Sequence, residues 1–394
     1  MNKIVVENVS KVFGPDPSAI IPLIEQGLSK QEILEQHGHV VGIRSLNLSI
    51  EAGETFVVMG LSGSGKSTLI RHFNRLIEPT AGRILVDGED VLDLSQAGLR
   101  DLRRKKISMV FQKFGLLPHR TVLENVAYGL VTSGVNKKEA YERAQAQIDL
   151  VDLTGYEGNY PRQLSGGMQQ RVGLARALAT DAEILLMDEA FSALDPVIRN
   201  DMQGQLQELQ AKLHKTIVFI THDLDEALRL GDHIAILKDG ELRQCATGSE
   251  ILLNPADEYV SRFVRDVNRA KVVTLGSICQ PVQSMPREQA SPDLCQDRLG
   301  DSRAILLTEG DKPAAMLTES YLLANADRSS EWWQSAGRLP AVTQVDGALT
   351  IEEGLNALGE TEAPILVVDK GGQPSGVVSR LMAIRALSGA TAPG

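Results

Sequence analysis

The fold is decided by the stretch TFVVMGLSGSGKST, which occupies residues 55–68. Its first part, Thr55–Met59, is a compact apolar run typical of a buried strand, and the spacing of Leu69, Ile70 and Phe73 beyond it predicts a helix. Between the two, Gly60-Leu61-Ser62-Gly63-Ser64-Gly65-Lys66-Ser67 matches the phosphate-loop pattern G-x-x-x-x-G-K-[ST]. A strand, a glycine-rich turn and a helix in this order predict an α/β domain that binds a nucleotide.

The residue types in this loop suit the binding of a triphosphate. Glycines let the backbone fold around phosphates so that its N–H groups point inward, and the following helix presents its positive end. Lys66 would pair with the β- and γ-phosphates, the Ser67 hydroxyl would bind Mg²⁺, and Thr68 would bond the α-phosphate. ATP and Mg²⁺ are therefore the predicted cofactors, and the predicted binding residues of the loop are Gly60, Ser62, Gly63, Ser64, Gly65, Lys66, Ser67 and Thr68.

A second apolar run ends in two carboxylates. Ile184–Met187 has the pattern of a buried strand, and Asp188 and Glu189 follow it directly. The carboxyl ends of parallel strands are where α/β proteins form their sites. We expect Asp188 to hold Mg²⁺ and Glu189 to act as the general base for the attacking water. An acidic pair after a strand is often only a solvated loop, but its place after a phosphate loop favours catalysis.

Residues 164–170, with the sequence LSGGMQQ, resemble the LSGGQ signature of the ABC ATPase family. They lead into a predicted helix over 169–178. Ser165 and the N–H groups of Gly166 and Gly167 would therefore meet a γ-phosphate at a helix N-terminus. In that family the motif serves the ATP of the opposite subunit. The resemblance implies a head-to-tail homodimer with two composite sites.

The remaining ABC motifs follow in the family's order. Phe13 resembles the aromatic residue that stacks on adenine, and Gln112 resembles the Q-loop glutamine that touches Mg²⁺ or the water. Residues 192–195, SALD, resemble the D-loop and add Asp195 to the nucleotide-binding set. His222 resembles the switch histidine that contacts the γ-phosphate. The resemblance thus implies catalysis by Lys66, Glu189 and His222, with Mg²⁺ at Ser67, Gln112 and Asp188.

Longer stretches are similar to the ATPases of glycine betaine/proline betaine importers, namely residues 24–30, 60–68, 75–80, 103–106 and 187–196. The similarity implies an importer of quaternary amines such as glycine betaine and choline. It further implies integral-membrane permease subunits as partners, a substrate-binding protein as an indirect partner, and a peripheral position on the cytoplasmic face of the bacterial inner membrane. An ABC ATPase that imports another small solute and a soluble ABC ATPase outside transport remain the alternatives.

The composition of the 394-residue chain limits the other classes of protein. A net charge of −11 leaves no basic excess for nucleic acid as a partner. The cysteines Cys245, Cys279 and Cys295 are too irregularly placed for a disulfide framework or a zinc site. No apolar run approaches the roughly 18–20 residues that cross a bilayer, and the N-terminal sequence lacks the pattern of a signal peptide. We expect any membrane role to come through a partner.

Two parts of the chain differ in sequence pattern. Residues 1–265 alternate β-rich apolar runs with helical patterns. For this α/β part, the resemblance implies an ABC-type P-loop NTPase domain with a RecA-like core, an antiparallel β subdomain and a helical subdomain over about residues 113–178. Residues 29–32, SKQE, predict a capping box that starts a short helix, with Gly38 as its end. Residues 266–394 predict a smaller α+β domain.

Within this second domain, residues 364–379 predict a strand, a glycine turn and a strand after a helix over 349–358, which resembles a CBS half-module. A weaker copy over 304–318 would complete a CBS-like pair, which betaine-transporter ATPases often carry as a regulator. Adenosine-binding CBS motifs usually place a ribose-binding aspartate where this chain has Tyr321 and Met382. A dimerisation or interaction module and a ligand sensor both remain open.

Overall fold

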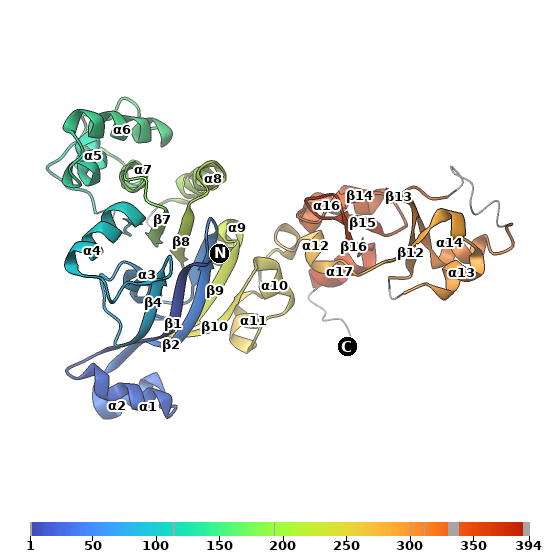
Figure 1. The fold of residues 1–394 in the computed structure, drawn as a ribbon, viewed down its shortest axis with the longest axis horizontal. Helices are drawn as coiled ribbons and strands as arrows, with labels where there is room; N and C mark the ends of the chain where they lie inside the picture. The colour runs from blue at the N-terminus through green and yellow to red at the C-terminus, as the bar shows by residue number, and fades with distance from the viewer. Residues whose placement is uncertain are drawn as a thin grey trace. The chain divides into compact units, whose positions relative to one another are not determined.

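The computed structural model describes residues 2–112, 115–192, 194–300, 302–310, 312–329 and 339–388. The chain forms two compact units (Figure 1). The first contains residues 1–248 and 256–263, and the second contains residues 249–255 and 264–394. Residues 249–255 therefore pack with the second unit, although they lie before the boundary expected from the sequence near residue 265.

A six-stranded sheet forms the centre of the first unit. All neighbouring strands are parallel except the edge pair β9–β10, which is antiparallel. Every residue of β3, β7 and β8 is buried, as is typical of parallel strands covered on both faces. The α/β prediction is confirmed, and the strand order is β10 (Glu241–Ala246), β9 (His233–Lys238), β3 (Thr55–Met59), β8 (Thr216–Thr221), β7 (Ile184–Asp188) and β6 (Ile107–Val110).

A second, antiparallel sheet packs against the first through one helix. Its order is β2 (Val40–Glu51), β1 (Asn2–Phe13), β4 (Ala81–Val86) and β5 (Glu89–Asp90). Helix α3 (Lys66–Phe73) contacts β2 and β4 on one side and β7 and β8 on the other. Its residues Leu69, Ile70 and Phe73 are fully buried in one core with side chains of both sheets. The helix that follows the phosphate loop is thus held between two sheets.

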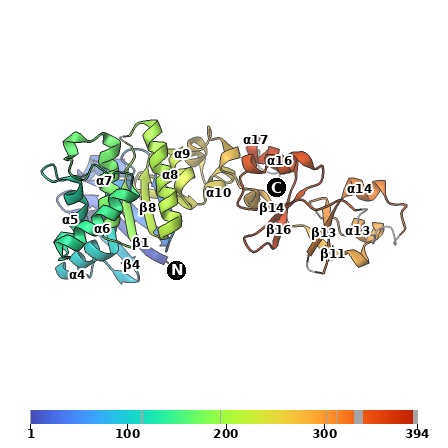
Figure 2. The ribbon, with the colours of Figure 1, turned by 90° about the horizontal axis from the view of Figure 1, so that it is seen from above.

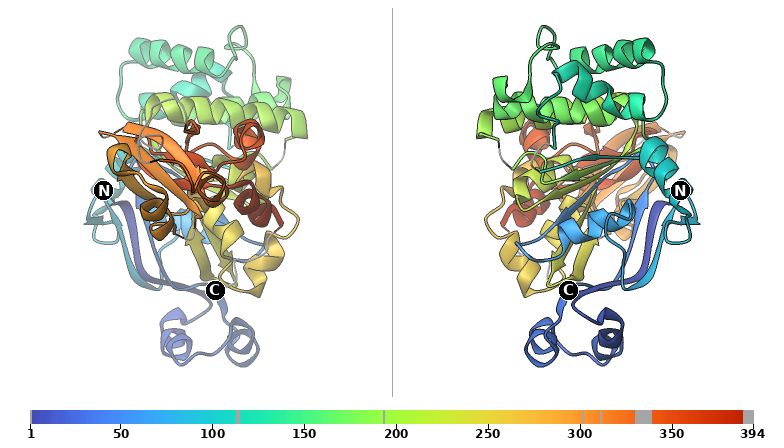
Figure 3. Two further views of the ribbon diagram at one scale, coloured as in Figure 1. Left: turned by 90° about the vertical axis from the view of Figure 1, so that its right-hand side faces the viewer. Right: turned by 90° about the vertical axis from the view of Figure 1, so that its left-hand side faces the viewer.

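A helical insert lies at the tip of the β1–β2 hairpin (Figures 1 and 3). It contains the 3₁₀ turn Pro17–Ile20, α1 (Ile21–Glu25) and α2 (Lys30–His37). The predicted capping box is confirmed, because the Ser29 hydroxyl accepts from the Glu32 N–H and the Glu32 carboxylate accepts from the Ser29 N–H. Gly38 ends α2 at a φ of 66°. A small apolar cluster attaches the insert to the hairpin and consists of Val12, Ile20, Ile24, Ile33 and Val41.

Helices complete the first unit. Helices α5 (Val122–Thr132), α6 (Lys137–Leu150) and α7 (Gly166–Ala179) pack together as a separate layer beside the sheet (Figures 1 and 2). Thr121 and Glu124 form a capping box at the start of α5. The other helices of this unit are α4 (Gln96–Asp101), which continues as the π-helical turn Leu102–Lys106, together with α8 (Pro196–Leu213), α9 (Leu224–Leu230) and α11 (Glu258–Phe263).

The second unit contains two similar β-α-β-β-α segments. Each has a three-stranded sheet whose first pair is parallel and whose second pair is antiparallel. The first segment is β11 (Gln283–Pro286), α13 (Pro292–Asp297), β12 (Ala304–Glu309), β13 (Lys312–Thr318) and α14 (Glu319–Ala324). The second is β14 (Gln344–Asp346), α16 (Ile351–Glu360), β15 (Ile365–Val368), β16 (Pro374–Val378) and α17 (Arg380–Ser388). Short helices α10 (Gly248–Leu253) and α12 (Leu275–Ile278) precede them.

None of the helices in the described part of the chain is long and apolar enough to span a membrane.

The packing of α3 generates a prediction about pH. His72 is fully buried on α3, its Nδ1 lies 2.7 Å from the Ile77 carbonyl oxygen, and burial lowers its pKa from 6.5 to about 4. Between pH 6.5 and 4 the imidazole of His72 is protonated in the unfolded chain but stays neutral in the folded chain. The free energy of unfolding therefore falls as the pH drops from 6.5 towards 4. We expect the parental protein to lose about 2–3 kcal/mol more over this range than His72→Asn, measured by urea denaturation followed by circular dichroism.

Carboxylates titrate over the same range in both proteins, so their contribution cancels in the comparison. Parallel stability curves for the parental protein and His72→Asn would contradict the assignment of a buried neutral imidazole.

Candidate functional site

The phosphate loop connects β3 to α3 and depends on two glycines with close backbone neighbours. At Gly60 the φ angle is 150°, and a Cβ atom would lie 2.2 Å from the Leu237 carbonyl oxygen. At Gly65 the φ angle is 100°, and a Cβ atom would lie 2.4 Å from the Gly42 carbonyl oxygen. A side chain at either position would displace backbone, so the loop conformation requires glycine at both.

Lys66 lies at the first position of α3 and its side chain folds back over the loop. Its Nζ donates to the Gly60 carbonyl at 2.7 Å and to the Leu61 carbonyl at 3.1 Å. Burial lowers the pKa of Lys66, while the charges of Glu189 and Asp188 oppose that shift. An ammonium held by loop carbonyls beside two carboxylates is placed to meet the charge of a bound phosphate chain.

The two groups predicted to hold Mg²⁺ from the phosphate loop and from β7 contact each other. The Ser67 hydroxyl donates to Asp188 Oδ1 at 2.8 Å, and Arg71 donates to Asp188 Oδ2 at 3.0 Å. A hydroxyl and a carboxylate are oxygen ligands of the kind that Mg²⁺ prefers. Among the described residues no group of three or more His, Cys, Asp or Glu side chains could hold a metal ion. The hydroxyl of Ser67 and the carboxylate of Asp188 are donors that fit a Mg²⁺ ion.

Glu189 lies where the predicted catalytic side chains meet. Its Oε2 accepts from Gln112 Nε2 at 2.9 Å, and its Oε1 lies 3.7 Å from His222 Nδ1. The φ angle of Glu189 is 47°, which is uncommon for a residue with a side chain, and its N–H donates to the Ile220 carbonyl. Such backbone strain persists only where surrounding structure enforces it. In this arrangement Gln112 contacts Glu189 rather than Ser67 or Asp188.

A pocket of about 460 Å³ opens over the phosphate loop. Most of the predicted nucleotide-binding residues line it, and so do Lys30 and the backbone around Val41, which sequence reasoning missed. The sequence marks Lys30 only as part of the helix start at 29–32 and of the family-like stretch 24–30, because its contact with the phosphate loop depends on how the insert folds onto the hairpin. The lining residues are Phe13, Lys30, Val40, Val41, Gly42, Ser62, Gly63, Gly65, Lys66, Ser67, Thr68, Gln112 and Glu189.

Other predicted residues lie close to this pocket without lining it. Gly60 and Ser64 form the base of the loop, and Ser64 is buried. Asp188 reaches the pocket region through Ser67, and His222 does so through Glu189.

The signature residues do not join this pocket in the single chain. Ser165 caps α7 by accepting from the Met168 N–H, and Ser165 and Gly166 are exposed. Gly167 lies against α8, where a Cβ atom would be 2.7 Å from Ile198 Cγ2. Asp195 caps α8 by accepting from two N–H groups at its start. Ala193 of the predicted D-loop lies outside the described residues.

Comparison with known proteins agrees with this geometry. A family model described as ABC transporter matches residues 43–192. The chain also resembles the dimeric structure of a post-hydrolysis state of the ATP-binding cassette MJ0796 bound to ADP and Pi. That match has a TM-score of 0.53 and 33% identity, and it covers 62% of this chain and 98% of the cassette. The chain is an ATP-binding subunit of an ABC transporter, an ATPase that hydrolyses ATP to power transport.

Comparison with individual proteins shows which family of ABC transporter ATPases the chain belongs to. The chain is 47% identical over 98% of its length to the glycine betaine transport ATP-binding protein OpuAA of Bacillus subtilis, 93% of which is covered. It is 52% identical over 69% of its length to the trimethylamine N-oxide transport system ATP-binding protein TmoW of Ruegeria pomeroyi, 80% of which is covered. The chain belongs to the family of glycine betaine transport ATP-binding proteins, as the sequence resemblance predicted.

The contact between Gly65 and the Gly42 carbonyl predicts that a methyl group added at Gly65 will weaken nucleotide binding. Gly65→Ala would push the Gly42 carbonyl, which lines the pocket, and would add the cost of a left-handed backbone at alanine, about 1–2 kcal/mol. We expect MgATP binding, measured by isothermal titration calorimetry, to weaken by at least about tenfold. Gly158→Ala is the control, because a Cβ atom there meets nothing within 4 Å. Equal binding by the two variants would contradict the assigned loop geometry.

Proposed function

We propose that two copies of the chain enclose two MgATP molecules and that their closure drives an attached permease. Each nucleotide would lie on the phosphate loop of one copy and be completed by Ser165, Gly166 and Gly167 of the other. The single observation that carries this proposal is the separation within one chain. The phosphate-loop pocket contains the triphosphate-binding residues, whereas the start of α7 is exposed away from that pocket. A helix N-terminus favours an anion, and a second copy would bring the γ-phosphate of its own nucleotide to this one.

The side chains around the loop support the following mechanism. Lys66 balances charge on the β- and γ-phosphates, and the N–H groups of the loop hold them in place. Glu189 orients and deprotonates the attacking water, and Gln112 holds the Glu189 carboxylate through its hydrogen bond. His222 lies beside that carboxylate, with Nδ1 3.7 Å from Oε1. Mg²⁺, held by Ser67 and Asp188, would neutralise phosphate charge. Hydrolysis would remove the γ-phosphate contacts that join the two copies.

The transported molecule would be a quaternary amine such as glycine betaine or choline. This part of the proposal rests on the relatives, because the transported molecule does not touch the ATPase subunit in this family's architecture. OpuAA is named for glycine betaine transport and aligns along nearly the whole chain. TmoW is named for trimethylamine N-oxide transport and aligns over 69% of the chain. Import of another small solute remains the second candidate. The partners would be permease subunits and, indirectly, a substrate-binding protein, with the chain peripheral on the cytoplasmic face of the membrane.

Uptake of labelled solutes tests this proposal. A strain lacking the encoding gene would be complemented with the parental chain and assayed for accumulation of glycine betaine, choline, carnitine and trimethylamine N-oxide. We expect complementation to restore uptake of a quaternary amine. Restored uptake of trimethylamine N-oxide alone would replace the proposed substrate class while leaving the transporter ATPase intact.

The control for this assay is Glu189→Gln, which keeps the shape of the side chain and removes the base. We expect it to bind MgATP and to accumulate as a nucleotide-bound dimer, with hydrolysis reduced by about 10²–10⁴-fold and uptake abolished. Gel filtration with and without MgATP would detect the dimer. Hydrolysis at the parental rate would remove Glu189 from its assigned role.

For the second unit we propose a degenerate CBS-pair-like domain that mediates association or regulation. The two β-α-β-β-α segments support the pair, since each places a hydroxyl, Thr318 or Ser379, at the start of its last helix. Three residues further, Tyr321 and Met382 stand where an aspartate would bind ribose. An exposed apolar groove between α16 and α17 favours association over sensing, and it is lined by Leu355, Leu358, Gly359, Arg380, Ala383, Ile384 and Leu387.

A negative charge introduced into this groove would distinguish a role in association from a role in ligand sensing. Ile384 is 61% exposed in the groove, and Leu323 is 60% exposed on α14 outside it. We expect Ile384→Asp to weaken nucleotide-independent self-association by about tenfold or more and Leu323→Asp to leave it near the parental level, measured by analytical ultracentrifugation. Unchanged association in Ile384→Asp would exclude the groove as the contact and would leave the sensor role.

A further inference from the structure

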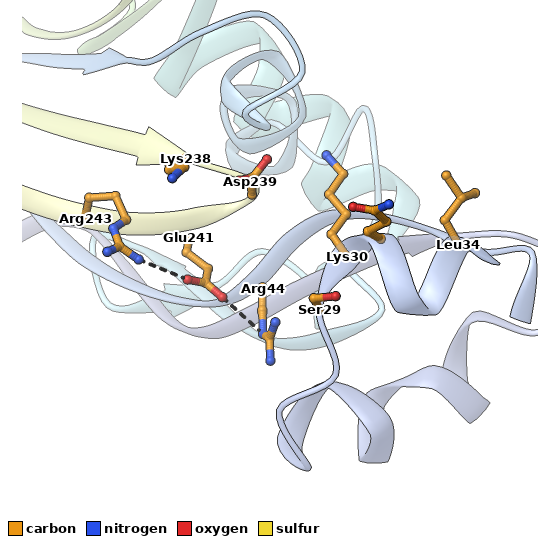
Figure 4. Close-up of a pocket in the computed structure, with 9 residues that line it drawn as sticks. Ser29, Lys30, Leu34, Arg44, Lys238, Asp239, Glu241 and Arg243 are labelled. Atoms are coloured by element: carbon orange, nitrogen blue, oxygen red, sulfur yellow. Dashed lines mark ion pairs between the residues drawn. The ribbon is translucent and has the colours of Figure 1, made fainter. Parts of the chain in front are cut away.

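Lys30 belongs to the walls of two neighbouring pockets. One is the nucleotide pocket over the phosphate loop. The other, of about 520 Å³, lies beside the helical insert (Figure 4). It is lined by Ser29, Lys30, Gln31, Leu34, Arg44, Lys238, Asp239, Glu241 and Arg243. Lys30 is therefore the side chain through which the insert reaches the phosphate loop.

The contact is specific in its atoms. Lys30 Nζ donates to the Gly63 carbonyl oxygen at 3.1 Å, across 33 residues of sequence. Gly63 has a φ angle of 78°, and a Cβ atom there would meet nothing within 4 Å. The side of Gly63 that a side chain would occupy is therefore open, and no packing there fixes the turn. The hydrogen bond from Lys30 supplies a restraint at a point of the loop where side-chain packing supplies none.

The other carbonyls around this turn are also held. Lys66 Nζ donates to Gly60 and Leu61, and the Gly240 N–H donates to the Ser64 carbonyl at 3.1 Å. The Ser64 N–H, which shares a peptide plane with the Gly63 carbonyl, donates to the Leu61 carbonyl at 3.2 Å. The bond from Lys30 and the bond from the Ser64 N–H therefore run head to tail through one peptide and strengthen each other, and they reach the Leu61 carbonyl that Lys66 also contacts.

The insert gives Lys30 a fixed starting point. The Ser29–Glu32 capping box and the apolar cluster around Ile33 hold α2 in place without using the Lys30 side chain. Arg44 ties the insert to the main sheet, since it donates to the Ile24 carbonyl at 3.0 Å and lies 3.3 Å from Glu241. Glu241 in turn pairs with Arg243 (Figure 4).

We propose that Lys30 is a positioning residue for nucleotide binding. It holds the Gly63–Ser64 peptide so that the phosphate loop is already shaped for the phosphate chain, and so it sets affinity rather than the hydrolytic step. The inference rests on the phosphate-loop site proposed above. The turn that Lys30 restrains would bind the α- and β-phosphates, which ATP and ADP share. Lys30 would therefore support the binding of MgATP and MgADP alike.

The test compares Lys30→Met, which keeps the length of the stem but removes the donor and the charge, with Lys30→Arg, which keeps both. We expect Lys30→Met to weaken the binding of MgATP and of MgADP by about three- to tenfold in isothermal titration calorimetry, a modest effect because the contact is partly solvated. The KM for ATP should rise by the same factor, with kcat within about twofold of the parental value. Lys30→Arg should bind within about twofold of the parental chain.

Two controls separate this role from others. Lys138→Met removes an exposed charge at the start of α6, away from the loop, and should bind nucleotide like the parental chain. The melting temperature of Lys30→Met should stay parental, since the insert does not need this side chain. Parental affinity in Lys30→Met would overturn the inference, and so would equal losses in Lys30→Met and Lys30→Arg together with a lowered melting temperature. Lys66→Ala tests the site itself, because parental binding in that variant would reject the phosphate-loop proposal and not only the role of Lys30.

Discussion

The constraint on which this molecule depends is the close packing of backbone against backbone at the phosphate loop. Gly65 lies against the Gly42 carbonyl of the antiparallel sheet, and Gly60 lies against the Leu237 carbonyl of the parallel sheet. The loop is thus fixed between two sheets by contacts that no side chain could make. Helix α3 continues from it into the core that both sheets share. The rigidity of the loop is therefore a property of the whole first unit and not of the glycine sequence alone.

That rigidity explains how the charged groups can be so close together. One small region holds the ammonium of Lys66, the carboxylates of Asp188 and Glu189, and the imidazole of His222. If the backbone that carries them moved, these groups would form other ion pairs or repel one another. Here Lys66 is held by loop carbonyls, Asp188 by Ser67 and Arg71, and Glu189 by Gln112. Each carboxylate has different partners, since Asp188 contacts Ser67 and Arg71 while Glu189 contacts Gln112, and this separation is what the roles proposed for the two carboxylates require. The Glu189 backbone, with a φ angle of 47°, is held by the bond from its N–H to the Ile220 carbonyl.

Much of this arrangement could be predicted from the sequence, because the phosphate loop, the acidic pair and the capping boxes are local patterns. The strand before Gly60, the helix after Gly65 and the helix that starts after Ser29 all follow from such patterns. What could not be predicted depends on distant contacts. No local signal brings Lys30 to Gly63, pairs Arg71 with Asp188 or joins Gln112 to Glu189. The packing of residues 249–255 with the second unit likewise depends on tertiary contacts, because the composition of that segment does not distinguish it from the residues before it.

The insert occupies the end of a β-hairpin, which is a place where a sheet accepts additional chain without loss of its ladder. Lys30 belongs to this additional chain, whereas the phosphate loop and Glu189 directly follow strands of the six-stranded sheet. Under the role proposed for Lys30, a change in the insert would alter the ATP concentration at which the subunit is half-saturated and would leave those elements untouched.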